Sequence, residues 1–187
     1  MTKLKLSILA VGRFDDYRKD IKKLIKVVSI FCKKNIQYKV VLNIVSPKNI
    51  PSSKNIVNVK NLQLIVHTNL NDRILQNLYK KNDIYLSSSI EEGFGFVIID
   101  AIKHNCLVIS TRTAGSIDIL GSDYPLMANN YRWYSLLKKI YYAIELLPEK
   151  NNINQRILNF LYQKKMLINL GDSYSIIKEL IWNLNFT

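Results

Sequence analysis

Cysteine is scarce in this 187-residue chain, which contains only Cys32 and Cys106. Two cysteines cannot form a disulfide scaffold, and with two histidines at no close spacing they do not predict a structural metal site. No apolar run is long enough to span a bilayer, and the first residues do not form the apolar stretch of a signal peptide. We therefore expect a cytoplasmic protein that holds no metal.

Glycine and proline are also few, at 6 and 4, whereas hydrophobic residues make up 48% of the chain. This composition favours one folded domain over a disordered chain. Acidic residues number 14 against 27 Lys and Arg, which gives a net charge of +13. The excess has two explanations: the Lys-, Asn-, Ile- and Tyr-rich composition of AT-rich genomes, in a cell or a virus, or attraction to phosphates, nucleic acid or an anionic membrane surface.

Short apolar runs alternate with segments of helical periodicity over the first 120 residues, which predicts a parallel α/β sheet. We expect a single Rossmann-like domain over 1–187, with a sheet core to about residue 128 and closing helices over 129–187. Strands are expected at 4–11, 40–45, 56–59, 62–66, 83–87, 106–110 and 124–127. Helices are expected at 18–34, 70–81, 94–104, after Gly115, and at 131–147, 154–167 and 174–184.

Two loops carry charged residues at the carboxyl ends of predicted strands, where sheets of this kind bind ligands. The loop 12–19 contains Arg13 and Lys19, whose combined donors suit a diphosphate. The loop 88–95 ends in Glu92, Gly93, Phe94 and Gly95 at the start of a helix, where free backbone N–H groups favour anions and glycine allows close approach.

Each of these features has a plainer explanation. Arg13 and Lys19 are explained equally by surface cations, and Glu92 by an acidic helix start. Asp100 follows Glu92 by eight residues and either binds a ribose diol or faces solvent. Gly115 lies in a further loop whose amides could contact phosphate. A ligand with hydroxyls near the carboxylates and phosphates near the cations, such as a nucleotide sugar, satisfies all of these groups together.

Four stretches of the chain resemble motifs in the donor-binding, C-terminal half of GT-B-fold glycosyltransferases of the retaining family 4. They are VGRFDDYRKDIKKLI, NDRILQNLYKKNDIYLSSS, EEGFGFVIIDAIKHNCLVIS and AGSIDIL. The third is similar to the family's signature of two acidic residues with seven residues between them. The sequence departs from the family pattern at Asp100, where the family has Glu, and at Ser88, where it usually has Pro.

The resemblance implies roles for these residues. Arg13 and Lys19 would bind the donor diphosphate, and Glu92 would lie beside the donor sugar. The backbone of Gly93, Phe94 and Gly95 would approach the sugar and phosphate. Asp100 would bind the ribose hydroxyls, and Gly115 would lie at the phosphate side. It also implies a retaining, metal-independent transferase that uses a nucleotide-diphosphate sugar as donor and needs no other cofactor.

Enzymes of this kind work between two Rossmann-like halves, and the motifs here match one half. We therefore expect a second chain, or a second copy of this one, to supply the acceptor site. The alternative is a non-catalytic nucleotide-sugar-binding or regulatory module. His67 and His104 fall at a strand end and a helix end, where a structural role is favoured over catalysis.

The predicted helix 131–147 mixes aromatic and cationic residues, among them Trp133, Tyr134, Lys138 and Tyr142. This mixture is typical of a helix at a membrane interface, although a core helix with a solvated lysine edge explains it too. We see no RNA-binding motif or zinc finger, so nucleic acid is not an expected partner.

Overall fold

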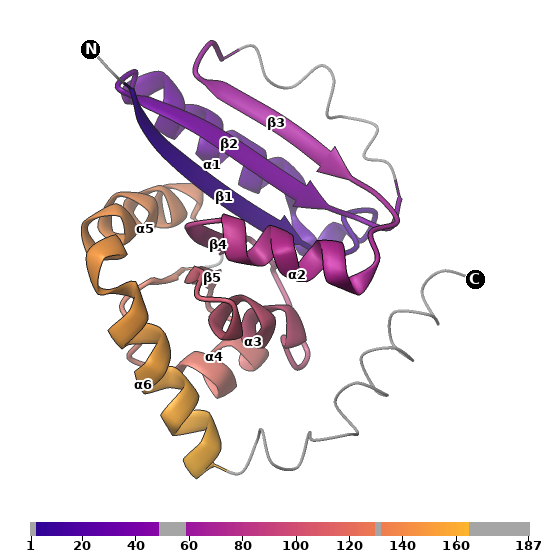
Figure 1. Cartoon of the computed structure of the whole chain (residues 1–187), viewed down its shortest axis with the longest axis vertical. Coiled ribbons are helices and arrows are strands. Elements are labelled where there is room, and N and C mark those ends of the chain that lie inside the picture. Colours follow the sequence, from indigo (N-terminus) through magenta and orange to yellow (C-terminus); the bar gives the residue numbers. More distant parts are fainter. Residues whose placement is uncertain (1–2, 49–58, 130–131, 165–187) are drawn as a thin grey trace.

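The computed structural model describes residues 3–48, 59–129 and 132–164. Within these residues a 6-stranded parallel sheet has the order β3-β2-β1-β4-β5-β6. The strands are β1 (Leu4–Val11), β2 (Tyr38–Val45), β3 (Leu62–His67), β4 (Ile84–Ser87), β5 (Leu107–Thr111) and β6 (Met127–Ala128). The α-helices are α1 (Ile21–Lys34), α2 (Asp72–Lys81), α3 (Phe96–Lys103), α4 (Ala114–Leu120), α5 (Trp133–Leu146) and α6 (Lys150–Gln163). This arrangement confirms the expected Rossmann-like α/β fold (Figure 1).

Two predicted elements fall largely or wholly outside the described part of the chain. They are the strand over 56–59 and the helix over 174–184. The division of the domain near residue 128 therefore stays a prediction.

The strand order reverses between β1 and β4. From β1 the chain moves outward through β2 to β3, and α2 then carries it back to the other side of β1. Ile8 pairs with Ile84 and Leu9 with Tyr85 across this junction. Figure 1 shows α1 and α2 on opposite faces of the sheet, as right-handed crossovers in opposite directions require. The loops that follow β1 and β4 consequently leave the same edge of the sheet side by side.

The helices α1 and α3 begin later than the sequence predicts, and the reason in each case lies in the backbone. Before α1, Tyr17–Lys19 form a 3-10 turn, and Asp20 adopts a left-handed φ of 43° while its side chain accepts a hydrogen bond from the N–H of Lys23. Before α3, Gly95 has φ 81°. A left-handed residue ends one local structure and lets a helix start in a new direction. Residues 88–95 are therefore left as a loop.

The amide of Asn61 joins three segments at the amino edge of the sheet. Its Nδ2 lies 3.0 Å from the carbonyl of Cys32, 3.2 Å from that of Asn35 and 3.0 Å from that of Tyr38. Asn61 is buried, so these contacts satisfy carbonyls that water cannot reach. One side chain thus holds the end of α1 and the start of β2 against the start of β3.

We predict that Asn61→Ala lowers the free energy of unfolding by about 1–3 kcal/mol, because it removes the buried side-chain donor that three carbonyl groups share. Urea denaturation followed by circular dichroism measures this change. Asn77→Ala, on the exposed side of α2, is the matched control and is expected to stay within about 0.5 kcal/mol of wild type. Equal stability of the two variants would contradict the role given to Asn61.

Candidate donor-binding site

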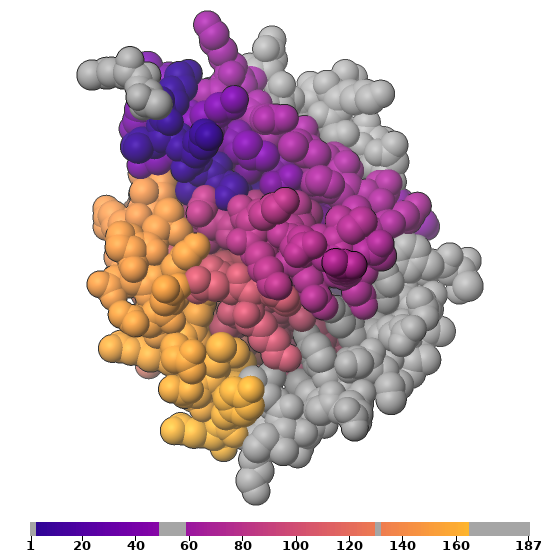
Figure 2. All heavy atoms as spheres, viewed as in Figure 1, coloured from indigo at the N-terminus to yellow at the C-terminus, as the bar shows by residue number. Residues whose placement is uncertain are grey.

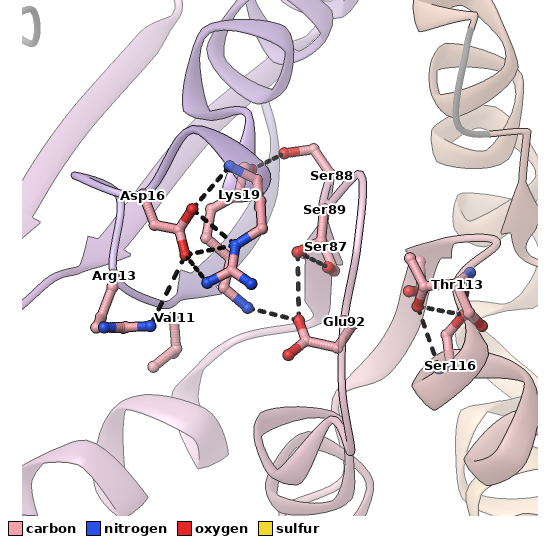
Figure 3. Close-up of polar contacts among 12 residues, drawn as sticks. Val11, Arg13, Asp16, Lys19, Ser87, Ser88, Ser89, Glu92, Thr113 and Ser116 are labelled. Carbon is pink, nitrogen blue, oxygen red and sulfur yellow. Dashed lines mark hydrogen bonds and ion pairs between the residues drawn. The ribbon is translucent and has the colours of Figure 1, made fainter. Parts of the chain in front are cut away.

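A hollow of about 740 Å³ opens at the carboxyl edge of the sheet, between the loops that follow β1 and β4. Seven of the eight predicted site residues line it: Arg13, Lys19, Glu92, Gly93, Phe94, Gly95 and Asp100. Figure 3 shows the side chains of the first loop facing Glu92 of the second. The structure therefore brings together groups that stand far apart in the sequence.

Lys19 and Glu92 form the direct contact between the two loops. The Nζ of Lys19 lies 2.6 Å from Oε2 of Glu92, and the two side chains are only 17% and 14% exposed. The hydroxyl of Ser89 donates to the same carboxylate oxygen at 3.3 Å. A charge-assisted hydrogen bond with this little exposure fixes the positions of both groups more firmly than a surface ion pair does.

A second cluster of charges lies on the first loop. Asp16 accepts hydrogen bonds from Nε and Nη2 of Arg18, the latter at 2.7 Å, and Nη2 of Arg13 lies 3.7 Å from the same carboxylate. The Arg18 guanidinium holds the pKa of Asp16 below its ordinary value, so this carboxylate is ionised at neutral pH. Asp16 in this way orders the guanidinium groups at the mouth of the hollow.

Backbone contacts of the second loop hold it against the first. The hydroxyl of Ser88 donates to the carbonyls of Lys19 and Asp20 at 2.8 and 3.0 Å, and the N–H of Ile90 donates to the carbonyl of Arg18 at 2.7 Å. Ser88 stands where the resembled family usually has Pro, which has no hydroxyl to donate. Serine at this position therefore adds hydrogen bonds between the two loops.

The three glycines predicted for the site differ in what their surroundings require of them. Gly95 needs its positive φ, and a Cβ there would lie 3.0 Å from Cδ1 of Ile119. Gly93 has open space around it. A Cβ on Gly115 would lie 2.4 Å from the carbonyl oxygen of Gly93, and the N–H of Gly115 donates to the carbonyl of Glu92. Gly115 does not line the hollow, and its predicted place beside phosphate stays a prediction.

Asp100 lies on α3 at the wall of the hollow and is 5% exposed. The alternative that Asp100 faces solvent is therefore wrong. Beneath it, burial raises the pKa of the Tyr85 hydroxyl, and the negative charges of Glu92 and Asp100 raise it further. Tyr85 consequently stays neutral and donates to the carbonyl of Val11 at 3.4 Å.

Sequence reasoning missed several polar residues that line or support the hollow. Asp16 and Arg18 lie in a loop that it had selected, but there only Arg13 and Lys19 were assigned. Ser89 was passed over within a run of three serines. Arg112 follows β5, lines the hollow and donates to the carbonyl of Ser122 at 3.1 Å. Its position at a strand end in the predicted sheet was the available signal.

Both histidines lie apart from the hollow. His67 ends β3 and its Nε2 lies 2.9 Å from Oδ1 of Asn43, while Nδ1 of His104 lies 2.8 Å from the carbonyl of Asp100. Neither histidine lines the hollow, and the structural role expected for them stays a prediction. Among the described residues, no group of three or more His, Cys, Asp or Glu could hold a metal ion.

A Rossmann-like fold with a hollow at its switch point, lined by charged and apolar side chains, is the architecture of one half of a GT-B glycosyltransferase. Residues 3–159 match the family model of the glycosyl transferases group 1, and the chain belongs to this family. Among curated proteins, no sequence match was found.

Solved structures with the same fold include trehalose-phosphate synthases. The UDP-forming α,α-trehalose-phosphate synthase of Burkholderia vietnamiensis has a TM-score of 0.71 at 12% identity, and the match covers 92% of this chain and 44% of that one. The enzyme of Burkholderia multivorans has a TM-score of 0.68 at 11% identity, covering 95% and 44%. The trehalose-6-phosphate protein of E. coli, bound with UDP-2-fluoro glucose, has a TM-score of 0.66 at 14% identity, covering 84% and 40%. This chain thus spans less than half the length of these proteins.

We predict that Gly115→Ala lowers the free energy of unfolding by about 1–3 kcal/mol, because its methyl group would force the Glu92–Phe94 backbone to move. Gly93→Ala is the matched control, since its methyl group meets no atom within 4 Å and its φ is not positive. Chemical denaturation of the two variants tests this difference. A Gly115→Ala protein as stable as Gly93→Ala would show that the close approach of these backbones is not a constraint.

Proposed function

We propose that this chain is the donor-binding half of a glycosyltransferase, which transfers a sugar from a nucleotide-sugar donor to an acceptor held by a second half. The observation that carries the proposal is the meeting of Lys19 and Glu92 at 2.6 Å inside a hollow also lined by Arg13 and Asp100. Cations and carboxylates lie within one hollow, as a ligand with both phosphates and hydroxyls requires.

Arg13 and Lys19 are proposed to stabilise the nucleoside diphosphate as its bond to the anomeric carbon breaks, because fixed cations lower the energy of the developing negative charge. Lys19 can do this without leaving Glu92, since an ammonium group has three donors. Glu92 would meanwhile accept hydrogen bonds from the sugar hydroxyls and hold the anomeric carbon in position.

The remaining predicted residues are proposed to contact the sugar and the ribose of the donor. Gly93 and Gly95 line the hollow, where their backbone would approach the sugar, and Phe94 is partly exposed beside them. Asp100 would accept hydrogen bonds from the ribose hydroxyls. We propose retention of configuration and independence from metal on the resemblance to family 4, with no cofactor besides the donor.

The acceptor site is proposed to lie on a second Rossmann-like half, in a partner chain or a second copy of this chain. Support comes from the length of the structural neighbours, of which this chain covers 40–44%. The cytoplasm is the proposed compartment, and it is consistent with two buried free cysteines. No helix of the described residues is long and apolar enough to cross a membrane.

The alternative is a nucleotide-sugar-binding or regulatory module without catalysis. The observation that favours it is the departure from the family pattern at Asp100 and Ser88. Binding of a donor without turnover, with every candidate second half present, would support the module.

We predict that Arg13→Ala and Lys19→Ala each weaken binding of a nucleoside diphosphate about 10- to 100-fold, the loss expected when one charge-assisted hydrogen bond is removed. Titration calorimetry with UDP, GDP and their glucose and mannose conjugates measures this, beginning with UDP-glucose because one structural neighbour binds a UDP sugar. Lys39→Ala is the control, because Lys39 is exposed in the first half of β2, away from the carboxyl edge. Equal affinities for all three variants would remove the donor assignment.

We predict that Arg13→Ala also abolishes sugar transfer in the presence of the second half. Transfer and donor hydrolysis are measured at donor concentrations that saturate each variant, so that weak binding alone cannot explain a loss. Unchanged turnover by this variant would exclude Arg13 from transition-state stabilisation.

A further inference from the structure

The aromatic side chains of α5 point away from the core. Trp133, Tyr134 and Tyr142 are 37%, 40% and 41% exposed. The inward side of the same helix consists instead of small and aliphatic residues: Leu136, Leu137, Ile140 and Ala143. Core packing therefore explains the aliphatic residues of α5 but not these three rings.

Tyr141 is a different case, because it fastens α5 to α1. Its ring packs edge-on against Phe31 with centroids 5.3 Å apart, and its hydroxyl accepts a hydrogen bond from Nδ2 of Asn35 at 2.8 Å. This contact fixes the two helices side by side, so that the outward sides of α1 and α5 form one continuous surface.

Cations lie over the exposed rings of this surface. Nζ of Lys26, on α1, is 5.2 Å from the centroid of the Trp133 ring, and the guanidinium carbon of Arg132 is 5.7 Å from that of Tyr134. Lys138 is exposed on the same helix. We call the set Lys26, Arg132, Trp133, Tyr134, Lys138 and Tyr142 the basic aromatic face. It contains three cations, and the exposed Glu145, three residues after Tyr142 and seven after Lys138, is the carboxylate that lies on the same side of α5, so that cations remain in excess.

This combination is the chemistry of the boundary between lipid headgroups and acyl chains. Tyr and Trp place an apolar ring below the headgroups and a polar group among them, while Lys and Arg are attracted by the negative potential of anionic lipids. We propose that the basic aromatic face docks the chain peripherally on an anionic bilayer. A nucleic acid fits less well, because its bases would have to displace Lys26 and Arg132 to stack on the rings they cover.

The face begins near the edge of the sheet at which the hollow opens and runs toward the opposite edge, where Tyr141, next to Tyr142, accepts its hydrogen bond from Asn35. α1 begins directly after Asp20, next to Lys19 of the hollow, and α5 follows β6, whose Ala128 pairs with the last residue of β5. In Figure 2 the orange residues of α5 cover one flank of the molecule. Docking through this flank would thus fix the position of the hollow relative to the headgroups. The docking inference does not rest on the proposed donor, and its test uses no sugar.

The test is co-sedimentation with vesicles of phosphatidylcholine alone and of an equimolar mixture with phosphatidylglycerol. We expect binding to the mixed vesicles only, weakening as salt is raised. Lys26→Glu/Lys138→Glu should lower the partition coefficient about tenfold or more, because two attractive charges become repulsive. Lys80→Glu/Lys81→Glu reverses two exposed lysines on α2 and has the same net charge, so it should bind nearly as wild type. Equal loss in both variants would mean that net charge alone acts, and would overturn the proposal.

A second variant tests the rings independently of charge. Tyr134→Ser/Tyr142→Ser should weaken vesicle binding several-fold, whereas Tyr162→Ser, at a 55% exposed tyrosine of α6, should not. Thermal melts establish that each variant is folded. In a Trp182→Phe background Trp133 is the remaining tryptophan, and its emission should shift to the blue on mixed vesicles. No shift, or tighter binding to duplex DNA or RNA through the same residues, would overturn membrane docking.

Discussion

The reversal of strand order between β1 and β4 is the constraint on which the rest of the structure depends. Because α2 returns the chain to the far side of β1, the loops after these two strands leave the sheet next to each other. Lys19 and Glu92, 73 residues apart, meet only for this reason. In a sheet whose strands followed chain order, β2 and β3 would both separate β1 from β4, at roughly 4.8 Å for each strand spacing, and no ion pair would join the loops.

Because the two loops lie side by side, ion pairs and hydrogen bonds can order the charged side chains of the hollow. Asp16 forms an ion pair with Arg18, and Glu92 forms one with Lys19. Each loop therefore supplies a carboxylate that pairs with a cation before any ligand is bound. Hydrogen bonds from Ser88 and Ile90 to the first loop then hold the pairs in fixed positions. Groups ordered in advance need little reorganisation when a charged ligand enters, which is the condition for strong electrostatic stabilisation in a catalytic site.

The sequence allowed the sheet to be predicted well, since buried parallel strands are short apolar runs; the expected and observed bounds of β1 are the same, at 4–11. Strand order could not be deduced from these runs, and the structure alone gives it. The starts of α1 and α3 were placed too early because periodicity does not reveal the left-handed φ of Asp20 and Gly95. Asp16, Ser89 and Arg112 were missed because their roles depend on which loop each one faces.

α1 is the element that connects the two polar regions of the molecule. Its start is capped by Asp20, immediately after Lys19, and Lys26 lies about two turns further along the same rigid helix. Lys19 lies in the turn that Asp20 joins to α1, and Lys26 reaches Trp133 from α1 itself, which Tyr141 and Asn35 fasten to α5. Any surface that binds the basic aromatic face must consequently hold the hollow at a fixed distance and angle. A reaction at that hollow would be confined to acceptors that reach the same plane.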